Sequence, residues 1–362
     1  MKKTDWALLA LSVGCGAIPM VAQTPASGDN AALLQQALRE SVLIDGNRPF
    51  HLILDIAPAV TDLPHHREVS PSLRGSMEIF WAAPNRYKLI LESPAFRQTK
   101  IVEGKRVEEH DEGDFYPRWL DNFVMALLSP VPQAQLAKLM PQGLTGGGTF
   151  TMPGRGVLQM PRCLETSDRP GGVTEETSIA RLCFDPANPW YESTLDFTRY
   201  VSFKDYAKFG GQMIPRTWSN DIPENLFVEG KVRTLEKLSK SEAAAIHVMA
   251  RTPESGQMRT VFLSRKDIEA QVESRPDFTW PAEDTETLEG WMIVYVRTDR
   301  RGQVRESYWD SSDNYKLQDA GVQFALKTTL KPMVVNGASV QMEGPLVIHF
   351  KTHRSGESSA AQ

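Results

Sequence analysis

The side chains that most often perform catalysis or bind metals are few and scattered in this sequence. Seven histidines occur among 362 residues, and only His65 and His66 are adjacent. Neighbouring side chains of an extended segment point to opposite sides, so this pair with Glu68 makes a poor metal site, and Pro64 favours a surface loop. The Gly-x-Ser-x-Gly, Gly-x-x-x-x-Gly-Lys-Ser/Thr and His-Glu-x-x-His motifs are absent from the sequence. We therefore expect no catalytic residues, no metal and no cofactor, and a protein that is not an enzyme.

Charge gives one more candidate for chemistry, the run Glu108–Glu112 with His110 at its centre. Two interpretations are open for it: a cation site, or the solvated edge of a hairpin that turns at Gly104. The second is favoured, because acidic runs beside turns usually face water. The net charge of -5 gives no electrostatic reason to expect a nucleic acid as partner.

The three cysteines indicate a redox compartment. Cys15 lies in an N-terminal apolar segment, and Cys163 and Cys183 each lie within a strand-like run. Turn-forming residues fill the stretch between them, at 167–172. In an exported chain a disulfide between Cys163 and Cys183 is the first interpretation, and two free, buried thiols are the second. A metal site is not favoured, because no histidines lie near the pair.

The first 23 residues have the order of a secretory signal. Lys2 and Lys3 precede an apolar run from residue 6 to residue 21, and Val21-Ala22-Gln23 offers small residues for cleavage. The apolar run contains Gly and Pro and falls short of the roughly 20 apolar residues that a spanning helix needs. We expect a cleaved signal peptide at 1–23 and a periplasmic location, with a retained membrane anchor as the alternative.

Residues 24–248 are predicted to form a mainly antiparallel β domain. An amphipathic helix is expected at 31–43, and from residue 50 the hydrophobic period changes to two. Turns at Pro84-Asn85 and at Gly104 connect neighbouring strands. A strongly apolar helix is predicted at 117–128, followed by a short helix at 133–140.

Several segments of this domain resemble the lipoprotein-carrier superfamily of LolA and LolB. The similarity spans about residues 30–240 and is carried by Gly75–Trp81, Pro84–Leu89, Asp114–Leu120, Cys183–Pro186 and Phe203–Pro215. The resemblance implies a half-open antiparallel β-barrel that is plugged by helices. It also implies an apolar concavity for an acyl chain or a peptide. The aromatic residues expected to line it are Trp81, Tyr87, Phe96, Trp119 and Phe123; the alternative is that they fill an ordinary core.

After a polar linker at 249–260, residues 261–352 are predicted to form a small ββαβ domain. Strands are expected at 290–298 and 304–309 around the Asp299–Gly302 turn, a helix at 315–328, and a closing strand at 343–350. This order resembles the TonB C-terminal domain, as do Ser311-Ser312-Asp313, Leu330-Lys331-Pro332 and Asn336-Gly337. The resemblance implies an exposed edge strand that pairs with an envelope or outer-membrane protein. A polar tail follows at 353–362.

Together these patterns predict an α+β fold and an exported, non-enzymatic adaptor. Its first domain is expected to bind an acyl chain or a peptide, and its second domain a protein partner. Two alternatives stay open. One is a TonB-type energy transducer for outer-membrane transport with a retained anchor, and the other is a periplasmic carrier of lipids or lipoproteins.

Overall fold

The computed structural model describes residues 27–351, apart from 47, 59–73, 131–143, 147–148, 153–155, 160–161, 166–180, 185–190, 197–198, 223–225, 254–255, 279–288 and 315–316. The predicted signal peptide, the His65-His66 pair, the expected helix at 133–140 and the polar tail lie outside the described residues. Within them, no helix has both the length and the apolar character to cross a bilayer.

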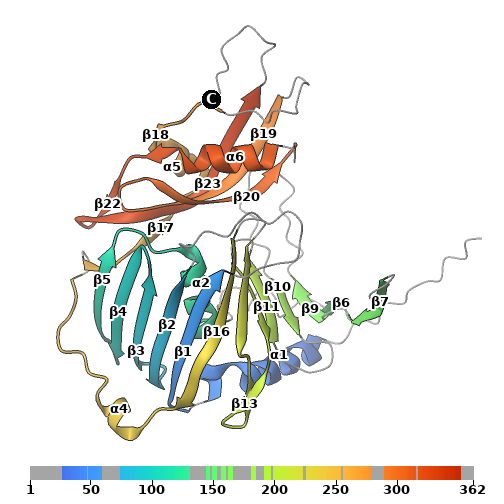
Figure 1. Ribbon diagram of the computed structural model, residues 1–362, viewed down its shortest axis with the longest axis vertical. Helices are drawn as coiled ribbons and strands as arrows, with labels where there is room; N and C mark the ends of the chain where they lie inside the picture. Colours follow the sequence, from blue (N-terminus) through green and yellow to red (C-terminus); the bar gives the residue numbers. More distant parts are fainter. Residues whose placement is uncertain are drawn as a thin grey trace, which may run out of the picture.

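Twelve antiparallel strands form one large open sheet (Figure 1), in the order β5-β4-β3-β2-β1-β16-β15-β12-β11-β10-β9-β6. Its strands are β1 (Phe50–Pro58), β2 (Gly75–Ala83), β3 (Arg86–Ser93), β4 (Phe96–Glu103), β5 (Arg106–Gly113), β6 (Leu144–Gly146), β9 (Arg162–Glu165), β10 (Arg181–Phe184), β11 (Tyr191–Asp196), β12 (Arg199–Lys204), β15 (Thr217–Ile222) and β16 (Leu226–Lys237).

The half-open barrel that the sequence predicted is not found, because the large sheet stays open. The first strand of the chain pairs with the last strand of this sheet, β1 with β16, and this pairing lies in the middle of the sheet. The two ends, β5 and β6, are not joined. Closure would require those two strands to exchange backbone hydrogen bonds.

The alternation of apolar residues sets the register of the first strands. Leu52 lies opposite Ile79, and Ile79 lies opposite Leu89, so one face of β1, β2 and β3 is a continuous apolar layer. All three side chains are buried. A shift of one residue would turn this whole set towards solvent, so burial of the layer specifies the pairing.

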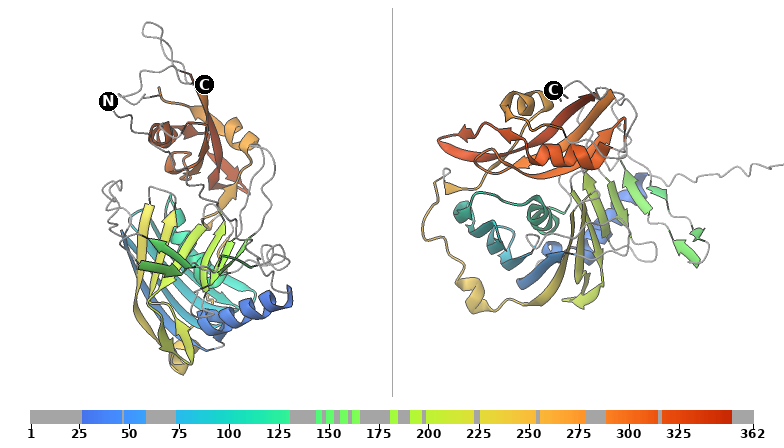
Figure 2. Two further views of the ribbon diagram at one scale, coloured as in Figure 1. Left: turned by 90° about the vertical axis from the view of Figure 1, so that its right-hand side faces the viewer. Right: turned by 45° about the horizontal axis from the view of Figure 1, so that its top comes forward.

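Helix α2 (Arg118–Leu128) covers the inner face of the sheet, which curves around it (Figure 2). Its apolar side chains join those of the strands in a single core. Trp119 reaches as far as Gly75, where an added Cβ would lie 2.8 Å from the indole ring and 2.4 Å from a backbone oxygen. Helix α1 (Ser27–Ser41), the 3-10 turn η1 (Leu43–Gly46) and the hairpin of β13 (Ala207–Phe209) and β14 (Gln212–Ile214) lie beside the same core.

The predicted disulfide joins Cys163 and Cys183, which lie directly opposite each other on β9 and β10. Both cysteines are buried. The bond encloses a sequence separation of 20 residues. A cross-link that closes a loop of this size lowers the entropy of the unfolded chain, which stabilises the folded state by about 3 kcal/mol. A second hairpin, β7 (Thr149–Met152) with β8 (Gly156–Gln159), lies in the same part of the chain.

The C-terminal sheet has the order β17-β23-β19-β20, and β22 pairs with β23. Its elements are β17 (Thr260–Phe262), α5 (Arg265–Gln271), β18 (Val272–Ser274), β19 (Glu289–Thr298), β20 (Val304–Ser312), α6 (Gln318–Leu326), β21 (Thr329–Leu330), β22 (Met333–Val335) and β23 (Ala338–Lys351). The predicted order of strand, strand, helix and strand is found in β19, β20, α6 and β23. Gly302 has the positive φ expected of the turn, at 84°, and an added Cβ there would collide with the Leu330 carbonyl. The relation to TonB stays a prediction.

Strands β17 and β18 and helix α5 have no counterpart among the elements predicted from the sequence. The stretch from residue 260 to residue 274 mixes charged and apolar residues without a clear period. Its strand β17 forms because Thr260–Phe262 pair in parallel with Gln341–Glu343 of β23, a contact that joins distant parts of the chain. Helix α5 begins at a Ser264 cap, whose hydroxyl accepts a hydrogen bond from the Asp267 amide.

Candidate functional site

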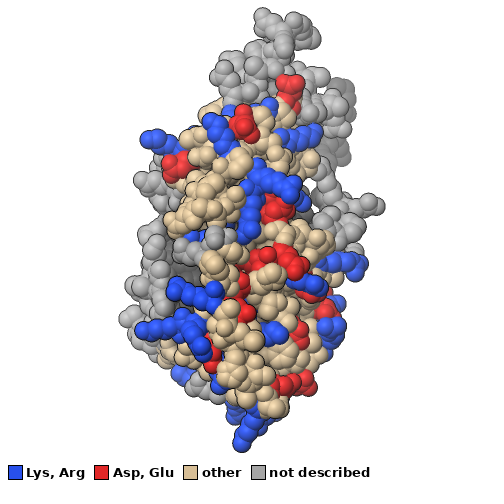
Figure 3. Space-filling model, turned by 90° about the vertical axis from the view of Figure 1, so that its left-hand side faces the viewer, with Lys and Arg blue, Asp and Glu red and all other residues tan. Residues whose placement is uncertain are grey.

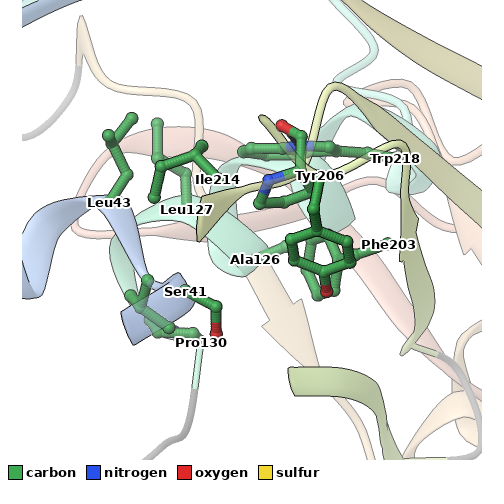
Figure 4. A pocket seen from close by; sticks show the side chains of 11 residues that line it. Ser41, Leu43, Ala126, Leu127, Pro130, Phe203, Tyr206, Ile214 and Trp218 are labelled. Carbon is green, nitrogen blue, oxygen red and sulfur yellow. Dashed lines mark hydrogen bonds between the residues drawn. The ribbon is translucent and has the colours of Figure 1, made fainter. Parts of the chain in front are cut away.

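The candidate site is an apolar pocket where α1, the end of α2 and the β13–β14 hairpin meet (Figure 4). Eight of its eleven lining residues are prolines or have large apolar side chains. The cavity volume is about 20 Å³. A cavity of this size holds about one water molecule. The lining residues are Ser41, Val42, Leu43, Ala126, Leu127, Pro130, Phe203, Tyr206, Ile214, Pro215 and Trp218.

A hydrogen-bonded contact holds the hairpin against the end of α1. The Gln212 side-chain amide donates to the Arg39 carbonyl at 2.8 Å and to the Val42 carbonyl at 3.0 Å. The last carbonyls of a helix lack partners within the helix, so Gln212 satisfies groups that would otherwise need water. This contact places Ile214 next to the apolar residues of α1 and η1.

The pocket floor continues into the core. Trp218 lies edge-on to Phe203, with ring centroids 5.7 Å apart, and is tilted against Phe123 at 6.3 Å. The indole N–H of Trp218 donates to the Pro215 carbonyl at 3.4 Å. The rings therefore form a continuous aromatic layer from the pocket into the interior of the large sheet.

The five aromatic residues predicted to line a concavity all belong to, or pack against, the core of the large sheet. Trp81 stacks on Tyr87 at 5.3 Å, and Phe96 packs on Tyr116 rather than on the pocket. Trp119 is buried beneath β2. Phe123 contacts the pocket indirectly, through Trp218. The sequence analysis did not predict the lining residues, because Ile214 belongs to a short hairpin, Tyr206 directly precedes that hairpin, and Ser41 ends a helix.

The opposite end of α2 is capped by the C-terminal sheet. Pro117 has no side-chain hydrogen bond to offer as the N-cap residue. Instead, the Arg118 amide donates to both carboxylate oxygens of Glu306 on β20, at 3.2 and 3.0 Å. A carboxylate at a helix N-terminus pairs with free amides and with the positive end of the helix dipole.

The Arg118 side chain continues this contact. Its guanidinium forms an ion pair with Glu343 on β23 and lies over the Tyr295 ring, 5.3 Å from its centre. The Tyr295 hydroxyl donates to Glu343 at 2.8 Å. All three side chains are buried, so these charge-assisted bonds form away from water.

Arg297 lies at the centre of the same interface and is 0% exposed. Its guanidinium is 3.3 Å from Glu343 and 3.7 Å from Asp121 on α2, and it donates to the Thr260 hydroxyl at 3.0 Å. It also lies over the Tyr116 ring at 5.5 Å. A buried charge of this kind needs its partners, because an unpaired ion in the interior is costly.

The two buried carboxyl groups respond differently to this setting. Burial acts to raise the pKa of Glu343, but Arg297 and Arg118 outweigh it, so this pKa lies below its usual value. Burial raises the pKa of Glu306, although Arg297 and the Arg118 amide oppose the shift. Burial also raises the pKa of the Tyr308 phenol well above its usual value, so this group stays neutral.

We name these residues the clamp: a buried polar contact between the start of α2 and the C-terminal sheet, formed by Tyr116, Arg118, Asp121, Tyr295, Arg297, Glu306, Gln341 and Glu343. Gln341 completes it by donating to the Tyr116 carbonyl at 3.3 Å. Apolar residues contribute less to this contact. The larger clusters of buried apolar side chains belong to the large sheet or to the C-terminal sheet, and Tyr295 with Tyr308 form a small third cluster.

The acidic run on β5 binds the chain's own connecting segment, residues 238–259. Glu108 accepts hydrogen bonds from the Met249 and Ala250 amides, and Asp111 accepts one from Met258. Thr252 exchanges hydrogen bonds with the backbone of Glu109. Figure 3 shows this side of the molecule, where acidic side chains gather near the middle. The expected solvated edge is therefore found only in part: His110 and Glu112 are exposed, whereas Glu108 and Asp111 bind the connecting segment and help to cover the edge strand.

Glu103 at the end of β4 makes the same kind of contact and gives a pH prediction. The Val248 amide and the His247 side chain hydrogen-bond to its carboxylate and lower its pKa. A carboxyl with a lowered folded pKa stabilises the contact above its unfolded pKa and loses that effect as pH falls through the folded value. We expect the Val248 amide NMR shift to follow this titration, and Glu103→Gln to give the acid-state shift at neutral pH. If the Val248 amide shift changes neither with pH nor on Glu103→Gln, the contact is contradicted.

The TonB resemblance implies an exposed edge strand that pairs with a partner. The C-terminal sheet ends at β17 and β20, so β23 is an interior strand. Strand β17 covers one side of β23 over Gln341–Glu343, and the Val347 amide donates to the Glu269 carboxylate at 2.9 Å. A partner strand at this side of β23 would have to displace these contacts, and the binding of a partner stays a prediction. In the part of the chain that the structure describes, no group of three or more His, Cys, Asp or Glu side chains is placed to hold a metal ion.

No family model matches the chain, and no curated protein matches it. Several solved structures are similar to it. A LolA superfamily protein from Nitrosomonas europaea is 10% identical, with a TM-score of 0.34 over 60% of this chain and 97% of that chain. A DUF1329 family protein from Desulfovibrio piger is 11% identical, with a TM-score of 0.30 over 61% of this chain and 98% of that chain. Neither is a TonB domain.

Proposed function

We propose that this chain is a periplasmic, non-enzymatic binding protein of the carrier type, whose ligand is an acyl chain or a similar linear apolar molecule. The observation that carries the proposal is the apolar pocket between α1, the end of α2 and the β13–β14 hairpin. Its lining is almost free of charge, and its aromatic floor runs into the core of the large sheet. Concave apolar sites of this kind are the usual places for hydrophobic ligands.

Entry of a chain requires one wall to move, because the cavity of about 20 Å³ holds only a water-sized group. Neither the β13–β14 hairpin nor α2 belongs to the large sheet, because β13 and β14 form a separate two-stranded sheet. Movement of either wall would therefore leave the large ladder intact. Movement of the hairpin would also break the contact from Gln212 to the end of α1 and expose Ile214, which is buried in the core.

Binding is tested by titrating the full chain with cis-parinaric acid, a fatty acid that fluoresces in apolar sites. Ala126→Phe fills the pocket from α2 and is expected to weaken binding by about tenfold, equivalent to about 1.4 kcal/mol. Ala244→Phe adds the same side chain at an exposed position of α4 (Lys240–Ala244) and should leave affinity unchanged. Equal affinity for the two variants, with both folded by circular dichroism, would place the ligand elsewhere.

A further inference from the structure

Helix α2 connects the two features described above. Its first turn is held by the clamp, and its last turn supplies Ala126 and Leu127 to the pocket. The helix has only 11 residues, so both ends belong to one short rigid element. A movement that frees the first turn will therefore reach the pocket.

The first turn depends on the C-terminal sheet for its polar partners. The N-cap residue is a proline, and the carboxylate that accepts from the Arg118 amide comes from β20. Asp121 faces Arg297 of β19. Separation of the sheet would return these charges to water and leave the helix start without its cap.

The composition of the clamp is that of an interface from which the C-terminal sheet can separate. Hydrogen bonds and ion pairs dominate the clamp, and interfaces of this polar kind within one chain commonly allow relative motion. The connecting segment would keep the C-terminal sheet tethered, because β5 holds its Met249 and Ala250 amides through Glu108. Undocking therefore needs no loss of either core.

We propose that the C-terminal sheet controls access to the pocket: docked, the clamp fixes α2 against the inner face of the large sheet, and undocked, it releases α2 so that the apolar ligand can enter. This inference rests on the proposed function, since the controlled site is the same pocket. The clamped form is the closed form, which agrees with the small cavity in this structure.

The direction in which a clamp mutation changes ligand affinity shows whether the C-terminal sheet controls access to the pocket or only supports the pocket. When only an open minority of molecules can bind, the apparent dissociation constant is the intrinsic one divided by the open fraction. Weakening the clamp raises that fraction and tightens binding. If the clamp only supported the site, weakening it would loosen binding or leave it unchanged. By linkage, bound ligand must also weaken docking of the sheet.

The experiment compares Glu343→Gln with Glu236→Gln in the full chain, using cis-parinaric acid as the probe. Both changes remove one carboxylate, but Glu236 lies on β16 and pairs with His51, away from the clamp. We expect Glu343→Gln to bind the probe at least about threefold more tightly, and to exchange amide hydrogens faster over residues 118–128. We expect Glu236→Gln to match the wild type in both measurements.

Each outcome decides the inference. Binding of wild type and Glu343→Gln with equal affinity, or weaker binding by Glu343→Gln, overturns control by the C-terminal sheet but leaves the proposed function intact. Binding by neither protein overturns the proposed function and this inference with it. If Glu343→Gln does not fold, Tyr295→Phe removes one hydrogen bond to the same carboxylate and is judged by the same criteria.

Discussion

Replacement of Arg297 by methionine is expected to lower the free energy of unfolding by about 3–5 kcal/mol, the usual cost of removing one partner of a buried ion pair. Methionine retains much of the volume of the side chain. The change leaves Asp121 without its arginine and Glu343 with only one of its two. Urea unfolding followed by tryptophan fluorescence measures the effect.

Arg233→Met is the control for this measurement. Arg233 lies on β16 and pairs with Asp55 at 3.5 Å, and the two side chains are 59% and 50% exposed. Exposed ion pairs contribute about 0–1 kcal/mol. Similar, small losses for the two variants would mean that the clamp does not stabilise the fold, and the account of the interface would be wrong.

Phe123→Ala is expected to lower the stability of the fold and to tighten binding of the probe. The side chain is fully buried, so its loss should lower the free energy of unfolding by about 3–5 kcal/mol. The space created lies directly behind Trp218, which forms the pocket floor. The floor can then recede, and we expect the less stable variant to bind cis-parinaric acid more tightly than the wild type.

Val334→Ala removes an apolar side chain from an exposed position and controls for the loss of apolar volume. Val334 is 62% exposed on β22, so we expect its removal to change stability by less than about 1 kcal/mol and to leave binding unchanged. Weaker probe binding by Phe123→Ala, at a protein concentration and temperature where it is folded, would argue against a pocket that opens into the core.

The features that the sequence predicted correctly depend on local patterns. The period of two in β1 to β3 fixed which residues are buried, and the apolar spacing after Pro117 located α2 to within one residue. Turn chemistry identified Gly302. The disulfide between Cys163 and Cys183 followed from their places in two strand-like runs separated by turn residues.

The features that the sequence missed depend on contacts between distant segments. Nothing around Glu306 shows that it caps a helix 188 residues earlier. The pairing of β1 with β16 joins the two halves of the large sheet, and the unpaired ends β5 and β6 leave it open; alternation alone cannot specify either feature. The contact between the acidic run on β5 and residues 249–258 was not predicted, because nothing in the sequence marks the amides that the run binds. The pocket was not predicted for a similar reason, since its walls come from three segments far apart in the chain.

The central claim is that an apolar chain binds between α1, α2 and the β13–β14 hairpin, and photo-crosslinking tests it most directly. The full protein would be irradiated with a fatty acid that carries a terminal diazirine, with and without excess unlabelled palmitate, and digested for mass spectrometry. We expect competable crosslinks within residues 203–218 and 118–130. Crosslinks confined to other segments, or labelling that palmitate does not reduce, would contradict the claim.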